Sequence, residues 1–128
     1  MLLSVQTSPG EFLDKLTILE IKSERMSDAA KLVNVRRELE LLRATWAASP
    51  LAGRDVSALV ADLKRVNEAL WDIEDSIRLK EAAQAFDADF VELARAVYRT
   101  NDRRAELKRE LNVSLGSDLL EEKSYQKY

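Results

Sequence analysis

The sequence predicts an all-α protein: an antiparallel bundle of about four helices, of which the last two form a long hairpin. Three observations support this fold class. Only 3 Gly and 2 Pro interrupt 128 residues, which favours long unbroken helices. Apolar residues recur three or four positions apart along most of the chain, the spacing of one helical face. Leu, Ala, Glu, Arg and Lys dominate the composition, and all five have high helix propensity.

Length and charge indicate a single globular domain, residues 1–128. A chain of 128 residues can bury a hydrophobic core without disulfides or metals. Charged residues make up 34% of the chain, and the net charge is −3 with both signs interspersed. Nucleic-acid-binding proteins usually concentrate positive charge on one face, so the sequence does not favour nucleic acid as a partner.

The chain has no His and no Cys, which removes the side chains most used in catalysis. His is the commonest general base and metal ligand, and Cys supplies thiolate nucleophiles and zinc ligands. There is no Gly-flanked Ser elbow either. The sequence therefore favours a protein that is not an enzyme and has no cofactor.

The first seven residues lack the basic segment and apolar core of a signal peptide. No apolar run reaches the ~18 residues that a membrane-spanning helix needs. We therefore expect a cytoplasmic protein with no membrane partner.

The first helix is predicted to begin at Ser8-Pro9-Gly10-Glu11 and to run to about Met26. Ser8 can cap it, Pro9 suits the first helical position, and Glu11 can complete a capping box. The apolar face is wide, which indicates burial on more than one side. Its members are Phe12, Leu13, Leu16, Ile18, Leu19 and Ile21.

The second helix is predicted to begin at Ser27-Asp28 and to end at Ser49–Gly53, where Pro and Gly oppose continuation. A single apolar stripe runs along it, formed by Leu32, Val35, Leu39, Leu42 and Trp46.

The third helix is predicted to be capped by Asp55 and to end near Ala83, and it carries the most regular apolar repeat of the chain. This repeat keeps the a/d spacing of a coiled coil. Its members are Val56, Leu59, Leu63, Val66, Leu70, Ile73 and Ile77.

The fourth helix is predicted to have Asp87 and Asp89 in its first turn and Gly116 just after its end. Few residues separate it from the third helix, so the two should form an antiparallel hairpin. A four-helix up-down bundle is the leading architecture, and a dimer of long hairpins is the alternative. Residues 117–128 are expected to form a short turn, at 118–123, and a tail. The apolar stripe comprises Phe86, Phe90, Leu93, Val97, Leu107 and Leu111.

Register within this hairpin brings polar residues to one level. Asn67 falls opposite Asn101, Trp71 falls opposite Tyr98, and the stripe of the fourth helix turns polar as far as Arg104. An unpartnered buried charge is costly, so the interrupted stripe indicates something other than ordinary packing. The candidate ligand-binding residues are Asn67, Trp71, Glu74, Tyr98, Asn101 and Arg104.

This polar layer has two interpretations. It can be a structural layer of ion pairs and amides that fixes helix register, as buried polar residues do in coiled coils. Alternatively, it is a pocket for a phosphorylated metabolite or a nucleotide. Arg104 would then supply charge, and Trp71 or Tyr98 would form a wall.

Glu68, Asp72 and Asp75 lie on one face of the third helix, at positions i, i+4 and i+7. Three carboxylates there could hold Mg²⁺, which prefers oxygen ligands, and could support an Mg-assisted hydrolase. The alternative is a solvated face, or one that meets the basic stripe of the fourth helix, formed by Arg95, Arg99 and Arg103.

Four segments together resemble an uncharacterised family of short bacterial all-helical proteins, a domain of unknown function. They are SPGEFLDKLTILEIKSER, NEALWDIEDSIR, VYRTNDRRAELKRE and EEKSYQKY. The resemblance covers nearly the whole chain and implies a bacterial cytoplasmic protein. It transfers no catalytic residue, because the family carries no established activity.

The expected function is therefore a non-catalytic helical module that forms a homo-oligomer or binds a helical protein partner. The a/d repeat of the third helix and the wide apolar face of the first support this expectation. The alternative is a small-molecule-binding protein or an Mg-assisted hydrolase that uses the polar layer.

Overall fold

The computed structural model describes residues 1–128, which form four α-helices and a short 3₁₀ helix. The α-helices are α1 (Pro9–Arg25), α2 (Ala29–Ala48), α3 (Ser57–Ala82) and α4 (Ala88–Ser114), and η1 (Pro50–Gly53) connects α2 to α3. There is no strand. The predicted all-α class and the long terminal hairpin are confirmed.

Short polar side chains cap three of the four α-helices: Ser8 as predicted, Asp28 within the predicted start of α2, and Asp87, which the sequence predicts one position further on, inside the first turn of α4. Ser8 accepts a hydrogen bond from the Glu11 amide at the start of α1, and Asp28 and Asp87 cap α2 and α4 in the same way. The start of α3 differs from the prediction. Asp55 bonds the amide and hydroxyl of Ser57, but the residue that precedes the helix is Val56, whose side chain cannot cap.

Two residues with positive φ end the long helices. Gly116 follows α4 as predicted, with φ 64°, and Gln84 turns the chain between α3 and α4 with φ 55°. Gly reaches this conformation without a steric penalty, whereas Gln pays a small one. The short turn predicted at residues 118–123 is not helical: the chain bends at Asp118, where the Leu119 amide donates a hydrogen bond to the Ser117 hydroxyl, and the rest of the segment has no regular secondary structure.

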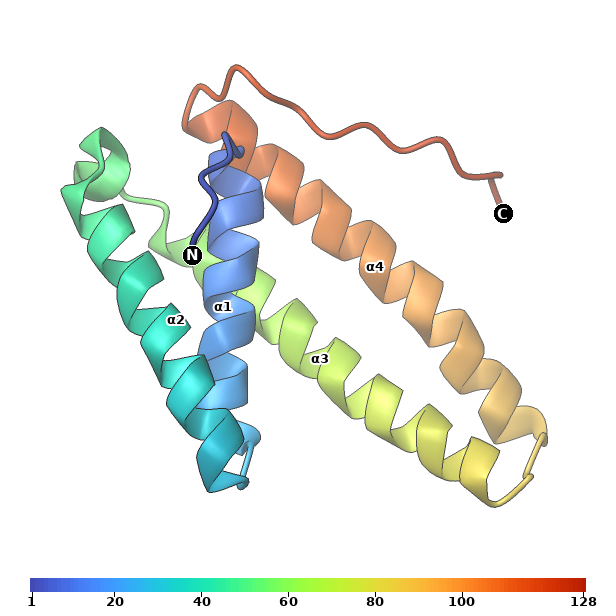
Figure 1. The fold of residues 1–128 in the computed structure, drawn as a ribbon. Helices are drawn as coiled ribbons and strands as arrows, with labels where there is room; N and C mark the ends of the chain where they lie inside the picture. Colours follow the sequence, from blue (N-terminus) through green and yellow to red (C-terminus); the bar gives the residue numbers. More distant parts are fainter.

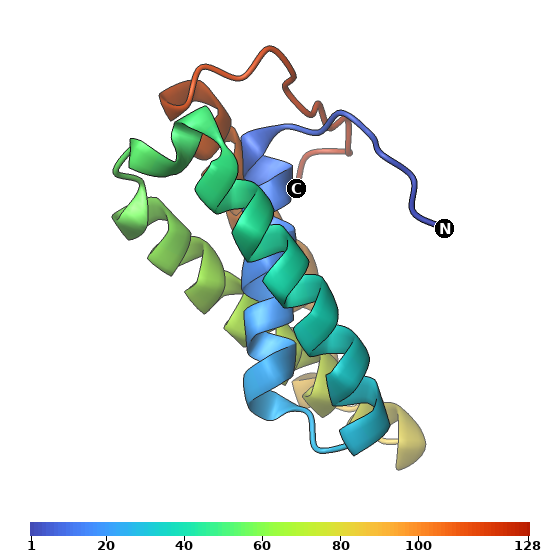
Figure 2. The same cartoon turned by 60° about the vertical axis from the view of Figure 1, so that its left-hand side comes forward.

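The four helices form two antiparallel hairpins, α1–α2 and α3–α4, that cross each other (Figure 1). α1 is the central helix, because its backbone approaches α2, α3 and α4. α2 runs along α1, and its backbone does not approach α3 or α4 (Figure 2). The bundle is therefore asymmetric, in keeping with the wide apolar face of α1 and the single stripe of α2.

The hydrophobic core lies where the two hairpins cross. α1 contributes most to it, and no residue from 68 to 106 is buried, so the far half of the α3–α4 hairpin lies outside this core. None of the helices is both long and apolar enough to cross a bilayer. The core residues are Leu13, Leu16, Leu19, Leu39, Val56, Leu63, Leu107, Leu111 and Leu115.

Candidate functional site

A cluster of polar side chains, the polar junction, joins α1, α3 and α4 at the crossing point. Its centre is the carboxylate of Asp14, which is 1% exposed. Arg104 donates two hydrogen bonds to this carboxylate, one of them from Nε to Oδ1 at 2.9 Å. Asn67 donates from Nδ2 to the same Oδ1 at 2.9 Å and to the Thr17 hydroxyl at 3.0 Å. One α1 carboxylate thus ties both helices of the hairpin to α1.

The buried polar atoms of the polar junction all find hydrogen-bond partners within the protein. The hydrogen bonds to Asp14 raise the pKa of Arg104 above its ordinary value, although burial acts in the opposite direction. No buried side-chain nitrogen or oxygen lacks a hydrogen-bond partner. Asn67 and Arg104 therefore direct their polar atoms to the protein itself, and this arrangement supports the structural interpretation of the polar layer.

A second polar contact joins the start of α1 to the end of α4. The Gly10 amide donates to Asn112 Oδ1 at 2.7 Å. Lys108 Nζ lies 2.6 Å from Glu11 Oε2 and 3.0 Å from Glu121 Oε2. Burial acts to lower the pKa of Lys108, but the hydrogen bonds to both carboxylates outweigh it and raise the pKa. This lysine therefore holds the C-terminal tail as well as α1.

Five of the six predicted ligand-binding residues line one groove of about 560 Å³, the corner groove, between α1 and the hairpin. Ile18 and Ile21 of α1 form its apolar wall. The structure thus brings together the predicted residues Asn67, Trp71, Glu74, Asn101 and Arg104.

Tyr98, the sixth predicted residue, lines a different cavity, between α4 and the C-terminal tail. This tail cavity has a volume of about 1140 Å³, and Asn101 and Arg104 border it as well. The tail packs on this helix face, where the rings of Tyr98 and Tyr128 lie 4.8 Å apart. The predicted pairing of Trp71 with Tyr98 in one site is therefore wrong, because the two residues line separate cavities.

The carboxylates predicted as Mg²⁺ ligands do not converge. Arg25 of α1 takes two of them: its guanidinium lies 3.7 Å from Glu68 Oε2 and 2.6 Å from Asp72 Oδ1. Asp75 instead borders the corner groove. No three acidic side chains in the structure lie close enough together to hold a metal ion.

The basic stripe of α4 does not meet the acidic face of α3 within the chain. Arg95 and Arg99 both pair with Glu92 of their own helix, and Arg103 pairs with carboxylates one and two turns further on. Glu74 of α3 likewise pairs within its own helix, with Arg78 at 3.2 Å. Each of these helices therefore neutralises its charges without an ion pair to the other helix at this level.

Asp14 and Thr17 are the residues of the polar junction that were not among the predicted site residues. Asp14 follows Leu13 and Thr17 follows Leu16, so the two polar residues lie three positions apart within the wide apolar face of α1. A polar pair inside an apolar face was the available signal. The partners of this polar pair depend on which helices pack on that face of α1, and the order of helices along the chain does not determine this.

A comparison with protein-family models found one match, described as "Family of unknown function (DUF6165)", over residues 3–128. This match confirms the resemblance to an uncharacterised family. Comparisons with curated proteins and with solved structures found no match.

Proposed function

We propose that this chain, which belongs to the family of unknown function DUF6165, is a non-catalytic helical module that self-associates through its hairpin arm. The hairpin arm is the far half of the α3–α4 hairpin, residues 68–106. The observation that carries the proposal is that the arm contains apolar stripe residues of both helices, as far as Val97 on α4, yet none of its residues is buried. The family supplies no activity, so the proposal rests on this geometry.

The apolar surface of the hairpin arm needs a cover that the chain itself does not provide. Two helices can bury only the line where they touch, whereas four helices enclose a core. Leu70 and Trp71 are only partly buried in the corner groove, and Leu79 near the tip is 71% exposed. A second arm laid on the first would remove this surface from water.

The charges of the hairpin arm favour a second copy of the same chain as its partner. Residues 68–82 of α3 include five acidic and two basic side chains, whereas residues 91–104 of α4 include two acidic and four basic ones. The ion pairs between α3 and the start of α4 are those of Lys80 with Asp87 and Asp89, beside the turn, and none joins α3 to residues 91–104. Further along the arm, the ion pairs form within one helix or with α1.

Twofold symmetry would use these charges twice. When two arms pack so that α3 of each copy faces α4 of the other, each acidic face meets a basic one. Like charges would face each other if the two α3 helices met, and this arrangement is disfavoured. Charge complementarity therefore favours the packing in which α3 of each copy faces α4 of the other.

Charge reversal tests this proposal. Changing Asp72 and Asp75 to Lys makes α3 basic, and changing Arg95 and Arg99 to Glu makes α4 acidic. Each variant alone should be a monomer in analytical ultracentrifugation at concentrations where the natural chain is a dimer. An equimolar mixture of the two variants should restore dimers, because each contact then pairs opposite charges.

The matched control is the double reversal of Arg36 and Arg37 to Glu on α2, where both side chains are exposed and distant from the arm. This variant should dimerise like the natural chain. A natural chain that stays monomeric at high concentration would overturn the proposal, as would two reversed variants that do not combine.

A further inference from the structure

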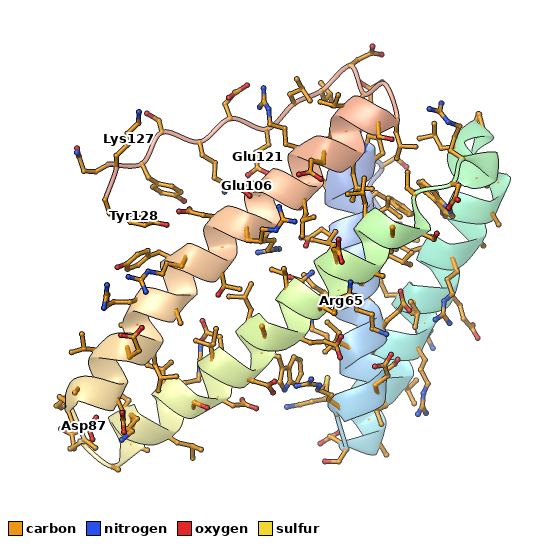
Figure 3. The ribbon with its side chains drawn as sticks, turned by 180° about the vertical axis from the view of Figure 1, so that it is seen from behind. Arg65, Asp87, Glu106, Glu121, Lys127 and Tyr128 are labelled. Carbon is orange, nitrogen blue, oxygen red and sulfur yellow. The ribbon has the colours of Figure 1, made fainter.

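The C-terminal tail, residues 117–128, runs back alongside α4 without secondary structure (Figures 1 and 3). It is fixed at two places. At the first, Glu121 pairs with Lys108 at 3.0 Å and Glu122 pairs with Arg109 at 3.3 Å. At the second, the Tyr128 hydroxyl donates a hydrogen bond to Asp102. Between these two places the tail and α4 border the tail cavity, which is open to solvent on one side. The tail therefore spans the cavity as a strap attached at both ends.

The contacts that hold the strap contribute little free energy compared with the conformational entropy that the tail loses on becoming ordered. Glu121, Glu122 and Tyr128 are exposed, and exposed ion pairs contribute little to stability. Each residue held in one conformation loses chain entropy. A ligand that filled the tail cavity would contact both the strap and α4, and would add the missing stabilisation.

The walls of the tail cavity differ in composition from the rest of the chain. All three Tyr of the sequence line it, in a protein where aromatic residues are scarce. Four of its lining side chains are basic and only one, Asp102, is acidic, although the whole chain has a net charge of −3. The aromatic and basic lining residues are Tyr98, Tyr125, Tyr128, Arg104, Lys108, Lys123 and Lys127.

The basic side chains differ in how far they are already neutralised. Arg104 and Lys108 are held by carboxylates behind the cavity wall. Lys127 forms no ion pair, and Lys123 lies 5.7 Å from the centre of the Tyr125 ring while it pairs with Glu121. On the strap, Lys127 is therefore the lysine with an unpaired positive charge, two residues from the exposed Tyr125 ring.

We propose that the tail cavity binds a phosphorylated compound with a planar ring, such as a nucleotide, and that the strap closes over it. Lys123 and Lys127 would contact the phosphates, and Tyr125 would stack on the ring. The volume of about 1140 Å³ accommodates a ligand of this size. All of these residues come from one chain, so the proposal does not depend on self-association.

Calorimetric titration of the full chain tests the ligand class, with ATP, adenosine and inorganic phosphate as separate probes. ATP should bind, and adenosine and phosphate should each bind at least about tenfold more weakly, because each provides only half of the contacts. Absence of ATP binding at millimolar concentration would overturn the proposal. So would tighter binding of a single-stranded oligonucleotide than of ATP, because this outcome would indicate a nucleic-acid surface.

Two strap variants test the residues without disturbing the core. Tyr125 is 77% exposed, so Tyr125→Ala should leave the fold intact and weaken ATP binding at least about fivefold through loss of stacking. Lys127→Ala should weaken ATP binding without affecting adenosine. Lys31→Ala, an exposed lysine on α2, is the matched control and should bind ATP normally. Unchanged ATP affinity in both strap variants would overturn the proposal.

Limited trypsin digestion tests whether the strap closes. Trypsin cleaves after Lys123 and Lys127, within the part of the strap that spans the cavity. ATP should slow cleavage there several-fold in the natural chain and have no such effect in Tyr125→Ala. Equal cleavage rates with and without saturating ATP would show that the strap does not close over the ligand.

Discussion

At the scale of single residues, the buried carboxylate of Asp14 organises the crossing of three helices. Removing a carboxylate and a guanidinium from water is expensive, and their attraction offsets this cost only when the geometry is good and the remaining polar atoms are satisfied. Here Arg104 binds both carboxylate oxygens and Asn67 adds a further hydrogen bond. The pair therefore acts mainly by excluding other helix registers, because any shift would leave a buried charge alone.

Replacing Arg104 with Met should lower the free energy of unfolding by about 2 to 3 kcal/mol, because Asp14 would lose its charged partner. This value lies at or below the range for fully buried pairs, since the Arg104 side chain is 29% exposed. Urea denaturation measures the change. The control is Arg103→Met at the preceding position, where all ion pairs are exposed. It should change the free energy of unfolding by less than about 1 kcal/mol. Equal effects of the two substitutions would contradict a special role for the polar junction.

At the scale of secondary-structure elements, α1 is the helix on which the others assemble. Its first turn lies against α4 so closely that a Cβ atom at Gly10 would overlap the carbonyl oxygen of Lys108 and lie 2.8 Å from Asn112 Oδ1. Gly10 costs the first turn some helix propensity, but it permits the hydrogen bond from its own amide to Asn112. Helix propensity has been given up here for a close helix–helix contact.

Gly10→Ala should therefore lower the free energy of unfolding by about 1 to 3 kcal/mol, because backbone atoms of α4 must move to accept the methyl group. Gly53→Ala is the matched control: open space surrounds this position, and its effect should stay within about 0.5 kcal/mol. Thermal and urea unfolding of both variants measure the difference. A neutral Gly10→Ala would mean that α1 and α4 are further apart than the structure shows.

At the scale of the whole molecule, a small core carries two extensions. The hairpin arm projects from the crossing point, and the C-terminal tail lies along α4 (Figure 3). Both extensions consist of residues that are exposed or only half-buried. Both proposals therefore concern surfaces outside the core, where binding can change without unfolding the protein.

Acidification should release the tail before the core unfolds. Hydrogen bonds from Lys108 and Lys123 lower the pKa of Glu121 below its ordinary value of 4.5. Because the pKa of Glu121 is lower in the docked tail than in a free tail, its ionised carboxylate stabilises docking above pH 4.5. This stabilisation is lost as the pH falls through the lowered pKa. Amide NMR shifts of residues 121–123 between pH 7 and pH 3 should report the release. Glu121→Gln should abolish this transition, whereas Asp118→Asn, which alters an unpaired tail carboxylate, should preserve it.

Much of the fold could be predicted from the sequence because its determinants are local. Ser8, Asp28 and Asp87 cap their helices by bonding amides three residues away, and Gly116 ends α4 through its own backbone freedom. Such contacts need no knowledge of the rest of the chain. The periodic stripes likewise depend only on spacing, and they predicted the helix count. The short connection between α3 and α4 predicted their hairpin.

The tertiary structure alone decided which polar residues meet. Asn67 and Arg104 were predicted as neighbours, but their common partner, Asp14, lies 53 and 90 positions away from them in the sequence. The sequence also left the position of α2 and the separation of Trp71 from Tyr98 undetermined. Helical periodicity specifies which face of a helix is buried. It does not specify which other helix covers that face or at what angle, and the partners of Asp14 follow from that crossing.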